Sequence, residues 1–391
     1  MESVIITICL LLLIAYVFDI SSSKTKIPSV ILLLILGWLV NNGFDFIQLS
    51  KPDFSKYLPI IGTIGLLLIV LDGALELELN KHKWRVVLKS FCIAFFPMLL
   101  LAMILVQVFN YYSDAGDQVK LINALPFCIV SSAIAIPSAI NLKSDSREFI
   151  IYESSISDIL GVMFFNFLIQ SDTIQSPEII AFGGQFLLIL ILSFIAVLGL
   201  SFLLSRLKHQ ITYAPILLII ILFYAFSKLY HLPGLLFILI FGLFLGNLDE
   251  LKQYSWIQKL NPDKLNAEII KFKHITIELT FIIRAIFFIV FGFTIDLNDI
   301  INLNTLPVAC IIVCSIYFIR MVSLLIFRIP LMPILFFAPR GLITILLFLS
   351  ISSELRIDIV NNSLVIQVVL LSVFILMIGN LINKKNKQES N

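Results

Sequence analysis

Apolar stretches long enough to cross a lipid bilayer recur along this chain and constrain its fold more than any other feature. A helix needs about 20 apolar residues to cross the hydrocarbon core, where the backbone must satisfy its own hydrogen bonds. With 60% hydrophobic and 13% charged residues, the chain is predicted to be an all-α polytopic membrane protein. We predict thirteen spans, at residues 3–20, 27–41, 58–77, 86–110, 121–141, 149–169, 183–205, 212–228, 232–247, 275–296, 305–327, 331–353 and 361–382.

Lysine and arginine residues are concentrated in the loops on one side of these spans. Lys24 and Lys26 follow the first span, Lys143 and Arg147 follow the fifth, and several lysines follow the ninth between residues 252 and 273. Cytoplasmic loops carry an excess of basic residues in membrane proteins. We therefore expect the N-terminus outside and the C-terminus in the cytoplasm, in a plasma (inner) membrane.

Two stretches of the first half recur in the second half in the same order. I-P-S-V-I-L-L-L-I-L-G from Ile27 resembles L-P-G-L-L-F-I-L-I-F-G from Leu232, and I-V-L-D-G-A-L-E-L from Ile69 resembles I-V-F-G-F-T-I-D-L from Ile289. The copies lie an odd number of spans apart, so they cross in opposite directions, as in inverted-repeat transporters. The predicted domain organisation is a single membrane transporter domain (1–382) with repeat one (1–169), a connector helix (183–205) and repeat two (212–382), followed by a short basic cytoplasmic tail (383–391).

Proline interrupts the fifth and twelfth spans, which are counterparts in this repeat. The fifth contains Pro137, and the twelfth contains Arg340 between Pro339 and Gly341. Proline lacks an N–H group and clashes with the preceding turn, so we predict that both helices are broken and cross each other. Unwound backbone and half-helix ends bind ions in such transporters. The alternative interpretation is a pair of ordinary proline kinks.

The sixth span carries acidic residues inside an apolar segment. An ionised side chain near the bilayer centre costs some ~2.5–3.5 kcal/mol or more, so such residues indicate function. On a helix Ser154 and Asp158 share one face, while Glu153 and Ser157 share another. Hydroxyl and carboxylate oxygens suit a hard monovalent cation at Asp158 and do not suit a transition metal. The alternative is a structural ion pair of Asp158 with an arginine, and the candidates are Arg284, Arg320 and Arg340.

Another acid and three arginines also lie within predicted spans. Asp72, near the cytoplasmic end of the third span, is either a cation ligand or an interfacial residue. Glu153 is expected to neutralise Arg340. Arg284 and Arg320 are expected to face protein or water and not lipid.

Several classes of function are disfavoured by the sequence. A formal net charge of +2 gives no reason to expect nucleic acid as a partner. The five cysteines lie in apolar runs without C-x-x-C spacing, so we expect neither a disulfide nor a metal site. No Ser/His/Asp set or phosphate-binding loop is recognisable, so neither an enzyme nor a cofactor is expected.

Three motifs together resemble the monovalent cation:proton antiporter superfamily along nearly the whole chain. E-S-S-I-S-D at 153–158 resembles its Glu-Ser-x-x-Asn-Asp motif, A-P-R-G-L-I-T at 338–344 its Pro-Arg-Gly motif, and L-D-G-A-L-E-L-E-L from Leu71 its third-helix signature. The resemblance implies a 13-helix fold with core and dimerisation domains. It also implies a homodimer whose core moves like an elevator.

The resemblance assigns roles to individual residues. Asp158 is expected to bind the ion and the proton, Ser154 to be a ligand, Asp72 to be an accessory acid, and Glu153 with Arg340 to form a structural pair.

Two positions depart from the pattern of the sodium/proton-exchanger branch. Where that branch has Thr-Asp-Pro in the broken fifth helix, this chain has Ala135, Ile136 and Pro137, and Ser157 replaces Asn before Asp158. The preceding Ser131 and Ser132 resemble the Ser-Ser start found in the potassium-efflux branch. The resemblance thus adds five residues to the predicted cation- and proton-binding site, namely Ser131, Ser132, Ala135, Ile136 and Ser157.

The expected function is exchange of Na⁺ or K⁺ for H⁺, with both ions competing for Asp158. If the pKa of this acid lies near the working pH, it can hold a proton or a cation but not both. A single carboxylate with Ser157 beside it suggests electroneutral, one-for-one exchange. The alternative is a membrane protein of the same fold that carries organic anions or acts as a ligand-gated sensor.

Overall fold

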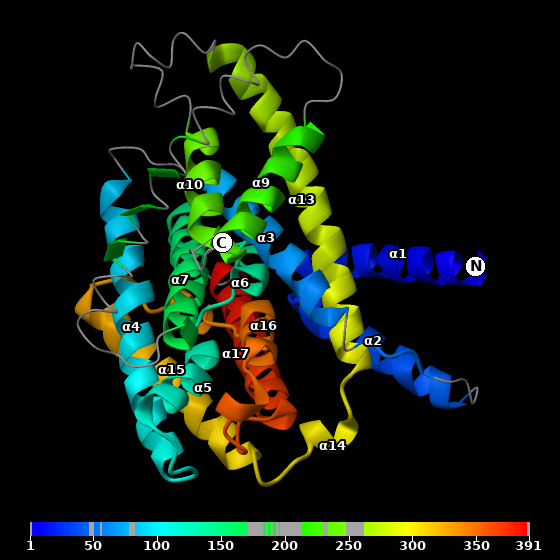
Figure 1. Ribbon diagram of the computed structural model, residues 1–391, viewed down its shortest axis with the longest axis vertical. Coiled ribbons are helices and arrows are strands. Elements are labelled where there is room, and N and C mark those ends of the chain that lie inside the picture. Colours follow the sequence, from blue (N-terminus) through cyan, green and yellow to red (C-terminus); the bar gives the residue numbers. More distant parts are fainter. Residues whose placement is uncertain are drawn as a thin grey trace. The chain divides into compact units, whose positions relative to one another are not determined.

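The computed structural model contains helices and connecting segments in its described part (Figure 1). The described residues are 2–46, 51–54, 57–77, 83–170, 213–229, 234–247 and 262–388, with short pieces between 183 and 195. The helices are α1 (Glu2–Thr25), α2 (Ser29–Phe46), α3 (Leu58–Glu76), α4 (Trp84–Asn110), α5 (Asp117–Cys128), α6 (Ser132–Ser138), α7 (Ser144–Gln170), α9 (Tyr213–Leu229), α10 (Gly234–Gly246), α13 (Pro262–Phe293), α14 (Leu297–Ile300), α15 (Leu306–Ile326), α16 (Leu342–Ser350) and α17 (Asn362–Gln388), with 3-10 turns η1 (Ile334–Phe336) and η2 (Ser353–Leu355).

The predicted all-α membrane fold is confirmed. Within the described residues, six segments are long and apolar enough to cross a membrane, and four shorter apolar helices accompany them. The predicted connector at 183–205 lies largely outside the described residues, as does Pro233 of the second repeat. Of the predicted tail, residues 383–388 continue α17, and residues 389–391 lie outside the described part.

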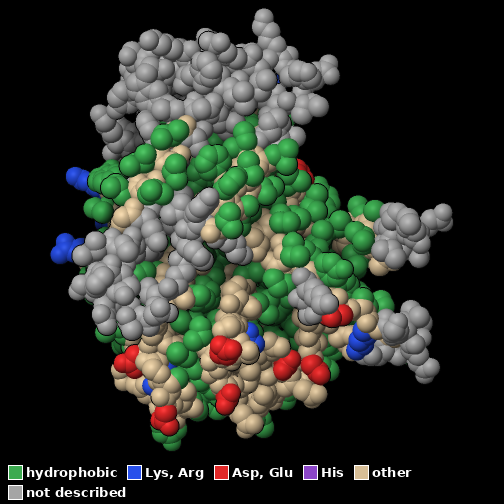
Figure 2. Space-filling model, in the orientation of Figure 1, with side chains coloured by type: hydrophobic (Ala, Val, Ile, Leu, Met, Phe, Trp, Pro, Cys, Tyr) green, Lys and Arg blue, Asp and Glu red, His purple; other side chains and the backbone are tan. Residues whose placement is uncertain are grey.

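Hydrophobic side chains face outward on helices of this protein, as expected in lipid. Leu100 and Met103 of α4, and Phe318 and Ile326 of α15, are exposed. Figure 2 shows hydrophobic side chains over much of the visible described surface. Lipid tails are as apolar as these side chains, so their exposure is not penalised in a membrane.

The helices form two compact units, and each unit draws on both halves of the chain. Unit 1 comprises Met1–Gly65, Lys89–Gly161 and Phe281–Asn391, and unit 2 comprises Leu66–Leu88 and Val162–Thr280. In unit 1, α5 lies beside α16 (Figure 1). Helix α17 lies beside α15 and η1. The fifth and twelfth predicted spans therefore meet within one unit.

In unit 1, glycines allow the backbones of α2 and α13 to touch. A Cβ atom at Gly37 would overlap the carbonyl oxygen of Ile289 and would lie 2.8 Å from the amide nitrogen of Phe293. At Gly292, a Cβ atom would lie 2.9 Å from the Cα atom of Leu34. This close approach requires residues without a side chain, so the two glycines permit the contact between α2 and α13.

Unit 2 contains an equivalent contact between α10 and α3. A Cβ atom at Gly242 would lie 2.5 Å from the Cβ of Ala74 and 3.4 Å from the carbonyl oxygen of Leu71. A Cβ atom at Gly246 would lie 2.8 Å from the carbonyl oxygen of Leu75. Helices α2 and α10 thus carry the glycines of one repeated stretch, and α13 and α3 carry the other. In each unit a helix of the first kind packs against a helix of the second kind from the opposite half of the chain.

Two helices of unit 1 are interrupted, and their unwound segments touch. Residues 129–131 separate α5 from α6, and residues 337–341 separate η1 from α16. The amide nitrogen of Ser131 donates to the carbonyl oxygen of Pro339 at 2.9 Å. A Cβ atom at Gly341 would lie 2.9 Å from the Ser131 hydroxyl oxygen, so glycine permits this approach. Both predicted broken helices are therefore present.

The first interruption lies at a different place from the one predicted. The break was predicted at Pro137, but Pro137 lies inside the seven-residue helix α6, and the break precedes this helix. Near the end of a short helix, a proline removes the donor to one carbonyl oxygen, here that of Ala133, without ending the helix earlier. Ala135 and Ile136, which directly precede Pro137, are helical residues of α6, and their part in cation binding stays a prediction.

Candidate functional site

Asp158 of α7 contacts the first turn of α6. Its Oδ2 atom accepts hydrogen bonds from the backbone N–H of Ser132, at 3.2 Å, and from the Ser132 hydroxyl group. Asp158 is 1% exposed. No residue in the described part of the chain donates to its Oδ1 atom. One carboxylate oxygen is thus held by the protein, and the other has lone pairs available for a further ligand.

Side chains of α7 also satisfy the unwound backbone before α6. The N–H group of Val130 donates to the hydroxyl oxygen of Ser157 at 3.0 Å. The amides of Ser131 and Ser132 donate to Pro339 and Asp158. Because buried backbone donors need acceptors, these three contacts explain why the helix can be broken here.

Arg340 caps the C-terminal end of α5. Its Nε atom donates to the carbonyl oxygen of Phe127 at 2.6 Å, and its Nη1 atom donates to that of Ala338 at 2.9 Å. Its backbone N–H donates to the hydroxyl oxygen of Ser372 at 2.9 Å. The end of a helix carries unsatisfied carbonyl groups and a partial negative charge, which stabilise this buried guanidinium.

The predicted partner of Glu153 is wrong, because Glu153 pairs with Arg320 of α15 and not with Arg340. Arg320 Nη2 donates to Oε2 at 2.8 Å, and Nη1 donates to Oε1. Arg320 Nε and Nη2 also donate to the carbonyl oxygen of Ile334, both at 3.1 Å. Both side chains of the pair are buried. The arginine fork satisfies both oxygens of Glu153 at once, whereas Arg340 is engaged by backbone carbonyls.

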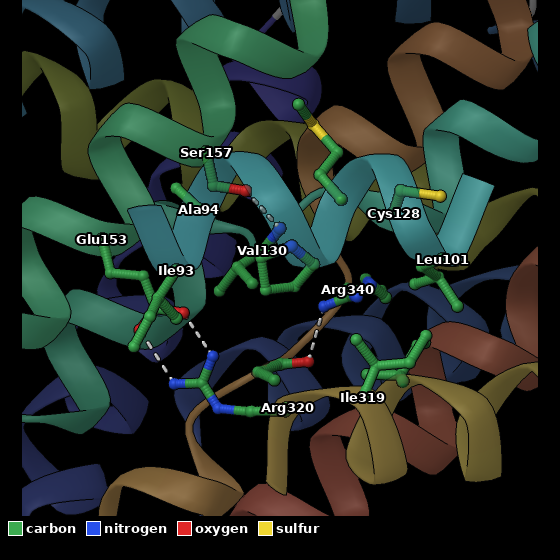
Figure 3. A pocket seen from close by; sticks show the side chains of 14 residues that line it. Ile93, Ala94, Leu101, Cys128, Val130, Glu153, Ser157, Ile319, Arg320 and Arg340 are labelled. Atoms are coloured by element: carbon green, nitrogen blue, oxygen red, sulfur yellow. Dashed lines mark hydrogen bonds and ion pairs between the residues drawn. The ribbon is translucent and has the colours of Figure 1, made fainter. Parts of the chain in front are cut away.

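A small cavity borders these charged groups (Figure 3). Its volume is about 30 Å³, which is enough to hold a water molecule. Figure 3 shows Glu153 and Arg320 facing each other, joined by two dashed lines. Ser157 and Arg340 also line the cavity, and its apolar wall includes Met98 of α4. The cavity therefore offers both room and polar partners for one water molecule beside the ion pair.

Ser154 and Asp72 are two other residues predicted to bind the cation. The Ser154 hydroxyl group donates to the carbonyl oxygen of Ile150, within its own helix, at 2.7 Å. Asp72 is a half-buried residue of α3 in unit 2, whereas Asp158 belongs to unit 1. Cation binding by Ser154 and by Asp72 stays a prediction.

Two further predicted residues lie next to Ser132. Ser131 directly precedes α6, and Arg284 of α13 contacts the backbone of α6. The Ser131 hydroxyl oxygen is buried and has no hydrogen-bond partner among the described residues. Arg284 of α13 donates to the carbonyl oxygen of Ala133 at 3.3 Å and to Oδ1 of Asp19 at 3.4 Å. Asp19 was not among the predicted site residues, although an acid inside the first predicted span is a detectable signal.

Known proteins resemble this chain along nearly its whole length. A family model described as "Sodium/hydrogen exchanger, transmembrane" matches residues 8–382. A structure of the sodium proton antiporter MjNhaP1 from Methanocaldococcus jannaschii at pH 8 has a TM-score of 0.71 and 19% sequence identity, and the match covers 96% of this chain and 99% of that one. An electron-microscopy structure of MjNhaP1 has a TM-score of 0.68 and 20% sequence identity, and the match covers 98% of this chain and 95% of that one. These two likenesses establish a shared fold. A search of curated protein sequences gave no significant match.

Proposed function

Because the chain belongs to the sodium/hydrogen exchanger family, we propose that it is a secondary antiporter that exchanges a monovalent cation for H⁺. The observation that carries this proposal is the environment of Asp158. Ser132 holds Oδ2, and Oδ1 accepts no hydrogen bond from any described residue. A proton and a cation exclude each other at such a carboxylate. Competition for Asp158 therefore couples the two flows.

Oxygen atoms around Asp158 suit Na⁺ or K⁺. Ser131 ends the unwound segment and Ser132 begins α6, and the hydroxyl group of Ser131 has no partner among the described residues. Hard cations prefer oxygen ligands. In this proposal Asp158 and these two serines bind the cation, Ser157 fixes the unwound backbone, and Asp72 is an accessory acid. Sodium is favoured as the cation because MjNhaP1 is a sodium proton antiporter.

The charges of the site favour one-for-one exchange. Arg320 is paired with Glu153, and Arg340 is engaged by backbone carbonyls. Next to Asp158 the broken helix presents Ser132, which is uncharged, in place of a second carboxylate. The site then carries either one H⁺ or one monovalent cation in each crossing, so the exchange moves no net charge.

Alternating access in this proposal follows from the inverted repeat of residues 1–169 and 212–382. The equivalent contacts of α2 with α13 and of α10 with α3 support that repeat. We propose an elevator-type movement of the core in a homodimer in the plasma membrane, with the N-terminus outside and the C-terminus in the cytoplasm. The distribution of basic loop residues supports this orientation.

Purified protein in liposomes with a trapped pH-sensitive dye tests the proposal. Addition of Na⁺ or K⁺ should drive proton movement in the wild type, and Asp158→Asn should abolish it while the protein remains folded. An imposed membrane voltage should leave the rate unchanged. A voltage-dependent rate would contradict one-for-one exchange, and exchange by Asp158→Asn would contradict the site. If neither Na⁺ nor K⁺ drives proton movement in the wild type, the alternative function, a sensor or a carrier of other solutes, would be favoured.

A further inference from the structure

A proline in α6 leaves one backbone carbonyl of this helix without its usual donor. The N–H group of Ala139 donates to the carbonyl oxygen of Ala135 at 3.0 Å, so the α-helical register continues past Pro137. In this register residue 137 would donate to Ala133, but proline has no N–H group. Ala133 is 5% exposed, so its carbonyl oxygen needs a donor from another part of the protein.

Arg284 of α13 supplies this donor. Its Nη1 atom lies 3.3 Å from the carbonyl oxygen of Ala133, and its Nη2 atom lies 3.4 Å from Oδ1 of Asp19 in α1. The hydroxyl group of Ser29 donates to the same Asp19 oxygen at 3.0 Å. The side chain of Arg284 is 11% exposed, against 38% for Asp19. The guanidinium is thus mostly inside the protein, where Asp19 orients it towards α6.

The same short helix carries the donors that hold the proposed ion-binding carboxylate. Ser132, which contacts Asp158, directly precedes Ala133. Helices shorter than ~12–15 residues are marginal on their own, and α6 has seven residues. Its position therefore depends on tertiary contacts, of which Asp158 provides one and Arg284 another.

We propose that Arg284 is a positioning residue for cation–proton exchange. It replaces the hydrogen bond that Pro137 removes, holds α6 in register and thereby directs Ser132 at Asp158. Arg284 contacts the backbone of α6 and acts on the cation only through the geometry of the site. The consequence for transport rests on the proposed antiport function, whereas the contact with Ala133 does not.

A compensating substitution provides a sharp transport test. Arg284→Gln should raise the cation concentration for half-maximal exchange by roughly tenfold, as expected for loss of a hydrogen bond from a charged donor. The maximal rate should change less. Pro137→Ala restores the missing N–H group, so in the Arg284→Gln protein it should bring this concentration back to within about threefold of that of Pro137→Ala alone. Arg328→Gln, at an exposed arginine, is the matched control and should change nothing.

The charge of Arg284 provides the competing explanation, and the same variants separate the two. If Arg284 acted through its charge alone, Pro137→Ala would not compensate for Arg284→Gln, because alanine supplies a backbone N–H group and no charge. That result would overturn the proposal.

Amide hydrogen exchange of solubilised protein gives a second readout that does not need transport. In Arg284→Gln, the peptide covering residues 129–142 should exchange faster, and addition of Pro137→Ala should restore its protection. Unchanged protection in Arg284→Gln would overturn the role of Arg284 even if transport were impaired. Wild-type vesicles without cation-driven proton movement would overturn the proposed function instead, and the protection pattern would still decide the role of Arg284.

Discussion

Ser132 donates both its backbone N–H and its hydroxyl group to a single oxygen of Asp158. The backbone donor is available because the chain is unwound just before α6, so no preceding helical turn accepts from it. Two donors on Oδ2 fix the plane of the carboxylate and leave Oδ1 open to an ion or a proton. The interruption of the helix therefore supplies one of the two donors that hold Asp158 in place for ion binding.

Ser132→Ala should move the pH profile of exchange. The substitution removes the hydroxyl donor and keeps the backbone donor. A hydrogen bond to a charged group contributes about 1.5–3 kcal/mol. Its loss disfavours the ionised carboxylate, so the pH of half-maximal exchange should rise by roughly one unit or more. Proton movement in liposomes across a pH series measures this shift.

The matched control for this substitution is Ser323→Ala. It removes a buried hydroxyl group that donates to the carbonyl oxygen of Ile319 within α15, so the profile should stay in place. An unmoved profile for Ser132→Ala itself would show that the hydroxyl group does not act on Asp158.

Ser131→Ala should separate cation binding from stability. Its hydroxyl oxygen is buried without a partner in the described structure, so its removal should leave the thermal unfolding temperature unchanged or raise it. If this oxygen is a cation ligand, the cation concentration for half-maximal exchange should increase several-fold. Ser154→Ala should have a smaller effect, because the Ser154 hydroxyl group is engaged by Ile150. A larger effect of Ser154→Ala would favour the ligand assignment that the family resemblance implies.

Double-mutant cycles should identify Arg320 as the partner of Glu153. Removal of one member of a buried ion pair leaves an uncompensated charge and costs about 3–5 kcal/mol. Glu153→Gln and Arg320→Met should each lower the unfolding temperature of solubilised protein, and the double variant should lose much less than the sum. The same cycle with Glu153 and Arg340 should be closer to additive. Strong coupling to Arg340 and none to Arg320 would contradict the observed pair.

The sequence predicted the all-α membrane fold, because hydrophobic length carries that information directly. It also predicted which two helices are broken, since prolines occupy both. It did not predict where α5 ends. That position depends on acceptors supplied by Ser157, Asp158 and Pro339, which lie far along the chain.

The partners of the buried arginines were not predictable from sequence for a related reason. Arg340 is satisfied by the carbonyl oxygens of Phe127 and Ala338, and a backbone acceptor has no residue-type signature. Glu153 was assigned to Arg340 of the broken twelfth span, although the rotation of α7 directs it to Arg320. Tertiary packing sets that rotation, and the hydrophobic periodicity of a strongly apolar helix does not reveal which side faces which neighbour.

Two glycines of α2 should respond differently to alanine. A Cβ atom at Gly37 would overlap the backbone of Ile289, which cannot move as a side chain would, whereas nothing lies within 4 Å of a Cβ atom at Gly43. Gly37→Ala should therefore force α2 away from α13 and destabilise the protein by about 1–3 kcal/mol. Gly43→Ala is the matched control and should be neutral or stabilising by roughly 0.5–1 kcal/mol, because alanine is the better helix former. Thermal unfolding in detergent compares the two, and equal unfolding temperatures would contradict the close contact of α2 and α13.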